Sequence, residues 1–152
     1  MASYTARTRE RKKNKQSHSE KIGAGNWVAI QDRVLSSDEF ARLSGSACKL
    51  LFEFIRLYRR INNGDLSISF EDLKERGWRS KTTLFKARDE LLDARFIIIT
   101  RQGGRGGICN LYALTFYAID ECLDKNGFSK IDVKPTRTPP DYWMDEFKPK
   151  AS

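Results

Sequence analysis

A glycine-rich loop with a central arginine is the stretch of this sequence best suited to binding a charged ligand. Residues Thr100–Thr115 read TRQGGRGGICNLYALT, with Arg101 near the start and Arg105 between two glycine pairs. A Walker loop needs a lysine followed by a hydroxyl residue, and a dinucleotide loop needs a third spaced glycine and a following helix. The loop has neither arrangement, so we expect no phosphate-bearing cofactor.

Two interpretations of this loop stay open. It is either an ordinary hairpin turn or a basic loop whose arginines contact phosphates or enter a minor groove. Counterion release and the negative potential of narrow grooves would favour the second kind of contact. We favour the basic loop, because RQGGRGG is longer than a tight turn requires.

A predicted helix after Ser80 supplies a second basic surface. Leu84, Ala87 and Leu91 recur at helical spacing and form its expected inner face. In its first half we expect Arg79, Thr82 and Lys86 to face outward, with Lys81 and Thr83 on the flanks and Ser80 as the cap. These six candidate DNA contacts are all cationic or carry a hydroxyl. Arg and Lys can read guanine edges, and Thr can contact a phosphate or a thymine methyl. The alternative is a solvated helix surface without a binding role.

The second half of that helix is acidic, with Asp89, Glu90 and Asp93, and we expect it to point away from a polyanion. Phe85 projects sideways between the two faces, and we expect it to complete the packing against the neighbouring strands.

The net charge of +8 is concentrated near the N-terminus. Residues 1–21 hold seven Lys or Arg against Glu10 and Glu20, a net charge of +5, and almost no large apolar side chain. Such a segment is expected to be disordered by itself. It is either a nucleic-acid-binding arm or a solubilising leader; we favour the arm, whose proposed contacts are Arg9, Arg11, Lys12 and Lys13.

Catalytic and metal-binding residues are scarce. His18 is the only histidine, and Cys48, Cys109 and Cys122 are too widely spaced for the paired ligands of a zinc site. We therefore expect no enzyme activity, no metal and no cofactor. The odd cysteine count, and the lack of an apolar signal segment or membrane-spanning run, favour reduced thiols in the cytoplasm and no membrane partner.

Hydrophobic periodicity and capping residues predict the order of the elements. A short helix follows Ser36, a longer one begins at Ser44 or Ser46 and ends at Asn62–Gly64, and a strand covers DLSIS. A brief helix after Ser69, the helix after Ser80, the strand FIIIT, the glycine loop and the strand NLYALTF complete the order.

The segments LSGSACKLLFEFIRLY, INNGDLSISFEDLKERGW, SKTTLFKARDELLDARFIIITRQGG and YALT together resemble the winged helix-turn-helix domains of plasmid and phage replication initiators and mobile-element regulators. The resemblance covers roughly Ser36–Phe116. It implies an α+β fold in the order helix, strand, helix, turn, helix, strand, wing, strand, with tails at both ends. Arg95 stands where such domains commonly have glycine. We expect a basic arm at 1–25, the winged-helix domain at 26–128 and an irregular tail, rich in proline and aromatic residues, at 129–152.

These observations favour a non-catalytic protein that binds double-stranded DNA, as a transcriptional regulator or replication accessory of a phage or plasmid. The rival hypothesis is a protein-interaction module that docks through the strand FIIIT or through Tyr142, Trp143 and Phe147. RNA binding by the same basic surfaces is a third hypothesis. A homodimer would suit two half-sites, although no heptad pattern indicates one.

Overall fold

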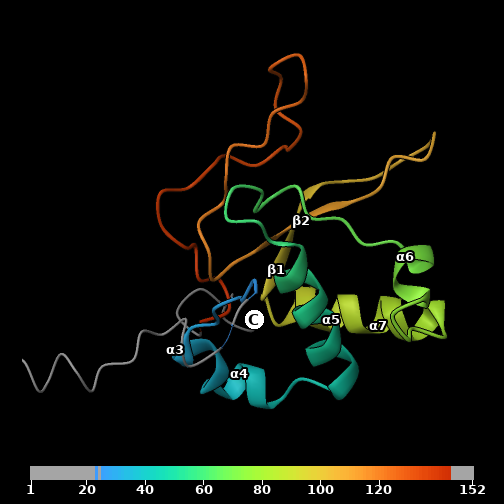
Figure 1. Ribbon diagram of the computed structural model, residues 1–152, viewed down its shortest axis with the longest axis vertical. Coiled ribbons are helices and arrows are strands. Elements are labelled where there is room, and N and C mark those ends of the chain that lie inside the picture. Colours follow the sequence, from blue (N-terminus) through green and yellow to red (C-terminus); the bar gives the residue numbers. More distant parts are fainter. Residues whose placement is uncertain (1–22, 24, 145–152) are drawn as a thin grey trace, which may run out of the picture.

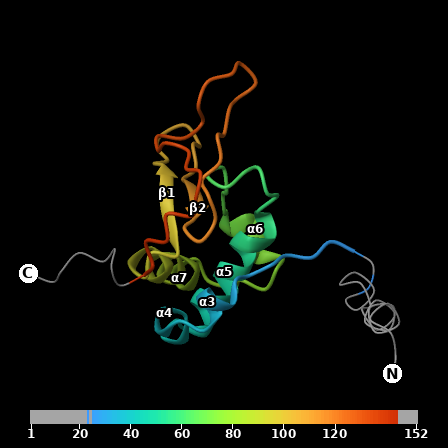
Figure 2. The ribbon, with the colours of Figure 1, turned by 90° about the vertical axis from the view of Figure 1, so that its left-hand side faces the viewer.

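The computed structural model describes residue 23 and residues 25–144 of the chain. This part combines helices with a small antiparallel sheet, as the α+β prediction requires. The helices are α3 (Asp32–Leu35), α4 (Asp38–Ala41), α5 (Gly45–Leu57), α6 (Phe70–Lys74) and α7 (Lys81–Asp93), and the strands are β1 (Ile97–Arg101) and β2 (Leu111–Leu114). Figures 1 and 2 show the strands rising from a layer that contains α3, α4, α5 and α7.

Serine hydroxyl groups fix where four of the helices begin. Ser44, Ser69 and Ser80 cap α5, α6 and α7, each accepting a hydrogen bond from a backbone N–H three residues on. Ser69 and Ser80 were predicted as caps, and Ser44 is one of the two candidates predicted for α5. The prediction for α4 was wrong by one residue, since Ser37 rather than Ser36 accepts the corresponding bond. Ser36 and Ser37 both carry a hydroxyl group that could cap the helix, and the backbone conformation decides which of them accepts the hydrogen bond.

Two other predicted boundaries were wrong. The helix α5 ends at Leu57 and does not continue to Asn62–Gly64; the Asn62 side-chain amide instead donates back to the Leu57 carbonyl at 3.1 Å. The predicted strand DLSIS is reduced to one antiparallel bridge between Leu66 and Tyr112 of β2. The bridge still places this segment beside β2, on the edge that β1 does not occupy.

The sheet is covered on both faces. Alternate residues of a strand point to opposite faces, and in β2 the side chains of Tyr112 and Leu114 join the core formed with the helices. The intervening residues Leu111 and Ala113 join a second apolar cluster with Ile119, Cys122 and Ile131, from the chain that follows β2. All four residues of β2 are consequently buried.

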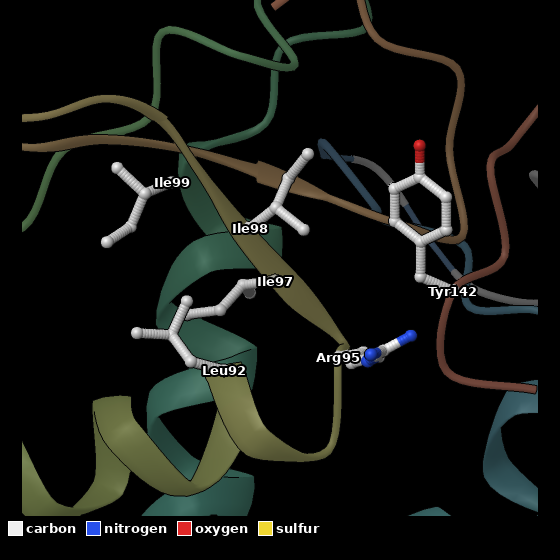
Figure 3. A pocket seen from close by; sticks show the side chains of 6 residues that line it. All are labelled: Leu92, Arg95, Ile97, Ile98, Ile99 and Tyr142. Carbon is white, nitrogen blue, oxygen red and sulfur yellow. The ribbon is translucent and has the colours of Figure 1, made fainter. Parts of the chain in front are cut away.

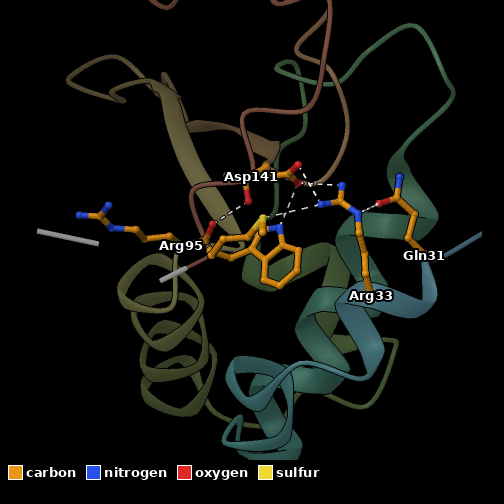
Figure 4. Close-up of polar contacts among 7 residues, drawn as sticks. Gln31, Arg33, Arg95 and Asp141 are labelled. Atoms are coloured by element: carbon orange, nitrogen blue, oxygen red, sulfur yellow. Dashed lines mark hydrogen bonds and ion pairs between the residues drawn. The ribbon is translucent and has the colours of Figure 1, made fainter. Parts of the chain in front are cut away.

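The described part of the predicted tail 129–152 is irregular in backbone but packs onto the domain. Trp143 is only 4% exposed, and its ring stacks on Phe96 with centroids 5.7 Å apart. Arg33 of α3 forms two hydrogen bonds of 2.9 Å with the Asp141 carboxylate, which also accepts from the Trp143 indole (Figure 4). Residues 129–144 therefore contribute to the core.

The ion pairs of Glu53 connect α5 to the chain after α6. The side chain is 5% exposed, and its carboxylate accepts from Arg56 at 2.9 Å and from Arg76 at 2.6 Å. Burial by itself would raise the pKa of the Glu53 carboxyl, but the hydrogen bonds and charges of Arg76 and Arg56 hold it below its ordinary value. The carboxylate is therefore charged at neutral pH and fixes the chain that leads into α7.

Arg95 ends α7 in a left-handed conformation that normally favours glycine. Its φ is 60°. The N–H of Arg95 bonds the Leu92 carbonyl and the N–H of Phe96 bonds the Leu91 carbonyl, which is the Schellman arrangement of a helix end. Arg95 thus completes the helix end in a conformation that favours glycine, with backbone strain as its cost.

We expect the Arg95→Gly variant to be about 1 kcal/mol more stable than Arg95→Ala, because only the alanine must hold a side chain at positive φ. Both variants lack the arginine side chain, so the comparison isolates the backbone. Urea denaturation followed by circular dichroism measures the difference. Equal stability of the two variants would show that residue 95 is not strained.

Candidate nucleic-acid interface

The helix α7 buries one face and exposes the other along its first half. Leu84, Ala87 and Leu91 are at most 1% exposed, as the sequence predicted. The six candidate DNA contacts of this helix are all exposed: Arg79, Ser80, Lys81, Thr82, Thr83 and Lys86. The Lys81 ammonium lies 5.5 Å from the centre of the Phe70 ring, so α6 and the first turn of α7 are in contact. The structure brings these six predicted residues together at one end of α7.

The β1–β2 loop projects toward the same side of the molecule as that end of α7 (Figure 1). Its outer part is closed by an antiparallel bridge between Gly104 and Ile108, and Gly106 and Gly107 have positive φ of 81° and 79°. Arg105 is exposed at the tip of the loop, between Gly104 of the bridge and Gly106. We call residues 102–110 the wing loop.

Gly103 permits a close approach at the root of the wing loop. A Cβ atom there would lie 2.6 Å from the Ile108 carbonyl oxygen and 2.8 Å from the Asn110 nitrogen, too close for any side chain. The loop glycines therefore have separate roles. Gly103 lets the two backbone segments at the root of the loop approach each other, and Gly106 and Gly107 turn the backbone after Arg105.

Arg101 is held at the wing root and does not project from it. It is partly buried, and its Nη2 donates to the Cys109 carbonyl at 3.3 Å. Its buried Nε has no hydrogen-bond partner within residues 25–144. Of the two arginines assigned to this loop, Arg105 is exposed, whereas Arg101 is partly buried and bonded to the backbone at the base.

A chain of polar contacts joins α7 to the wing root. Arg88 of α7 lies close enough to the Tyr112 side chain for the two to interact and to raise the pKa of Arg88, and the Tyr112 hydroxyl accepts from the Asn110 side-chain amide at 3.3 Å. The Asn110 side-chain oxygen, Oδ1, accepts in turn from the Gly103 N–H. These contacts fix the direction of the wing loop relative to the helix. These contacts have no local signal in the sequence, because residues 88 and 112 lie on different elements.

The acidic half of α7 makes contacts within the molecule. Asp89 pairs with Arg88 at 2.6 Å, and the Glu90 carboxylate accepts from the Ser44 N–H at 2.6 Å and from its hydroxyl at 2.7 Å. Glu90 thus holds the residue that caps α5, where negative charge is favourable. The polarity of α7 was predicted from the sequence, but the contact of Glu90 with the cap of α5 was not.

Several residues assigned as possible contacts lie outside the described part of the chain: Arg9, Arg11, Lys12, Lys13 and Phe147. Of the other two residues of the proposed aromatic contact, Tyr142 is 37% exposed, whereas Trp143 is packed in the core. The aromatic contact surface proposed from the sequence is therefore not continuous, because its tryptophan is occupied by Phe96 and Arg33.

An apolar groove of about 300 Å³ follows β1. Figure 3 shows its lining side chains arranged around the strand: Leu92, Arg95, Ile97, Ile98, Ile99 and Tyr142. It combines the strand and the tyrosine that the protein-interaction hypothesis invoked separately.

The three cysteines are free thiols. Burial raises the pKa of the Cys122 thiol above its ordinary value, and the nearby carboxylates of Asp65 and Asp120 raise it further. Burial and then the charge of Glu90 likewise raise the pKa of Cys48. Both thiols stay protonated at neutral pH and are therefore poor nucleophiles. Within the described residues, no group of three or more His, Cys, Asp or Glu side chains is placed to hold a metal ion.

No family model matches this sequence, and the searches of curated proteins and of solved structures found no similar chain. Among the described residues, the helices all lack the length and apolar character needed to cross a membrane.

Proposed function

We propose that this chain binds double-stranded DNA, without catalysing a reaction, through a winged helix-turn-helix domain. In this proposal the first half of α7 lies in the major groove, and the wing loop contacts phosphates or the adjacent minor groove. The bridge from Leu66 to β2 supports the fold assignment, since the chain then runs through helix, bridge, two helices, strand, loop and strand.

The observation that carries the proposal is the common direction of two basic features. The β1–β2 loop and the first half of α7 lie on the same side of the molecule (Figure 1), and Arg105 and the cationic and hydroxyl residues at the start of α7 are exposed. The Arg88–Tyr112–Asn110 contacts hold them in that relation before any ligand binds. Preorganised cations lose less freedom on binding than mobile ones. A basic N-terminal segment would add contacts to phosphates that do not depend on sequence.

The biological role that we propose is that of a cytoplasmic transcriptional regulator or replication accessory of a phage or plasmid. This step depends on the resemblance of residues 36–116 to winged-helix domains of such elements.

Replacing Arg105 with alanine is expected to weaken duplex binding and to reduce the slope of log affinity against log salt concentration by about one unit, because one phosphate contact is lost. Fluorescence anisotropy with a labelled duplex between about 50 and 200 mM salt measures both effects. Stability should be unchanged, because Arg105 is an exposed loop residue.

The matched control is Arg137→Ala, which removes an exposed arginine from the segment after β2. It should keep the parent slope. If Arg105→Ala and Arg137→Ala had the same slope as the parent, the wing loop would not contact DNA.

A protein-interaction module is the second candidate, and the groove along β1 favours it, because Ile97, Ile98 and Ile99 line an open apolar surface beside Tyr142. Apolar docking depends little on salt, whereas phosphate contacts weaken steeply as salt rises. The same salt series therefore separates the two candidates. An RNA duplex of equal length in the titration tests the third hypothesis.

A further inference from the structure

Phe85 is an exposed aromatic side chain on the basic half of α7. It is 46% exposed, and it lies one helical turn after Lys81 and directly before Lys86. We expected Phe85 to complete the packing against the strands, and this prediction was wrong. The buried face of α7 is complete without it, because Leu84, Ala87 and Leu91 fill that face.

The ring of Phe85 is held in place by Arg88. The Arg88 guanidinium carbon lies 5.0 Å from the ring centre, and Arg88 is itself fixed by Asp89, with bonds of 2.9 and 2.6 Å, and by the Tyr112 side chain. Burial alone would lower the pKa of Arg88, but its hydrogen bonds to Asp89 and its interaction with the Tyr112 side chain raise the pKa above the ordinary value, so the guanidinium over the ring stays charged. Tyr112 belongs to β2, so Phe85 lies on the side of α7 that faces the wing root.

This arrangement limits what the ring can contact. A side chain that inserts between two stacked bases presents both of its faces, but one region of the Phe85 surface is already covered by the Arg88 guanidinium. The remaining exposed surface suits a single small apolar group. On a helix in the major groove, the apolar group that a base pair presents is the 5-methyl group of thymine.

We propose that Phe85 reads the 5-methyl group of a thymine in the target duplex, an inference that rests on the proposed DNA-binding function. Lysine contacts along α7 cannot supply this discrimination, because an ammonium group contacts base acceptors or phosphates. Phe85 is thus a specificity-determining residue, and Arg88 is the positioning residue that orients its ring.

Deoxyuridine substitution tests the proposal, because deoxyuridine lacks only the methyl group and keeps every hydrogen-bonding edge of thymine. A preferred duplex is first selected from a random pool with the full chain, and its thymines are then replaced one at a time. At one or two positions the parent should bind the deoxyuridine duplex about threefold to fourfold more weakly, the loss expected for one buried methyl group.

The Phe85→Ala variant should bind the thymine and deoxyuridine duplexes equally. Phe85→Leu should keep part of the preference, and it replaces the alanine variant if that one binds too weakly to compare. The matched control is Lys86→Ala, which should bind more weakly overall and keep the parent preference for thymine. The ratio of the two affinities is the readout, because general weakening or partial unfolding would not change it.

The outcomes separate this inference from the proposed function. Failure of the parent to bind any duplex would overturn the proposed function, and the reading role with it. Duplex binding with no loss at any deoxyuridine position, or a selected site without thymine, would overturn the role of Phe85 alone. Retention of the thymine preference by Phe85→Ala would do the same.

Discussion

The Asn63→Ala variant is expected to lose about 4 kcal/mol of folding free energy. Asn63 is fully buried, and its amide nitrogen donates to the carbonyls of Leu114, Tyr117 and Ala118 at 2.9, 3.2 and 2.8 Å. Its side-chain oxygen accepts from the Leu114 N–H at 2.8 Å. Alanine leaves these backbone groups without their partner in the core, and each unsatisfied buried group costs about 1–3 kcal/mol. Since small domains have about 5–15 kcal/mol in total, the variant would be close to unfolding.

Urea denaturation followed by circular dichroism measures this loss. The matched control is Asn126→Ala, because Asn126 is exposed in the turn between Asp124 and Phe128, and it should change stability by less than about 0.5 kcal/mol. Asn63→Asp is a second test, since it keeps the acceptor but loses the donor, and it should be at least as unstable. A loss below about 1 kcal/mol in Asn63→Ala would mean that Asn63 does not organise this part of the fold.

The features that could be predicted from sequence are those with local causes. A serine before a periodic apolar run identifies a helix start, which is why the caps at Ser69 and Ser80 were found and Ser44 was one of two candidates. The spacing of Leu84, Ala87 and Leu91 likewise fixed which face of α7 is exposed. Every residue that contributes to these signals lies within a few positions of the others.

The features that could not be predicted depend on partners far away in the chain. Asn63 was interpreted as part of a helix stop, because Asn and Gly favour such turns. Its side-chain amide instead donates to the Leu114 carbonyl, which lies on a strand far away in the chain. Glu90 was expected only to point away from a polyanion, although it bonds Ser44, the residue that caps α5. A polar residue that satisfies remote backbone groups shows no periodicity, so its role emerges only when the chain is folded.

In the candidate site too, the features with local causes were predicted and those with distant partners were not. The exposure of Lys86 and Arg105 follows from helical spacing and from a glycine loop, and both were predicted. The contacts that set the wing loop against α7 were not predicted, because Arg88 and Tyr112 belong to a helix and a strand. Sequence thus indicated which side chains are available, while the fold determines how they are oriented together.

The Trp143→Ala variant is expected to lose about 3–5 kcal/mol of folding free energy, as large aromatic truncations in cores do. Trp143 is 4% exposed, stacks on Phe96 at 5.7 Å and lies under the Arg33 guanidinium, 5.6 Å from its ring centre. Removing the indole opens a cavity beside Phe96. It also deletes the indole N–H that donates a hydrogen bond to Asp141. The Arg33–Asp141 ion pair would then have to hold residues 129–144 against the domain without the packing of the indole ring.

Trp27→Ala is the matched control for this prediction, because it removes the same kind of side chain from a position that is 48% exposed. It should cost about 1 kcal/mol, the order of one partly solvated cation–π contact with Arg60. Urea midpoints and slopes should be compared for both variants, since detachment of the C-terminal segment alone would also lower the slope. Equal, small losses in the two variants would place Trp143 outside the cooperative core and make the segment after β2 a separable tail. A large loss in Trp143→Ala alone would show that this segment folds together with the helices that carry the proposed DNA-binding surface.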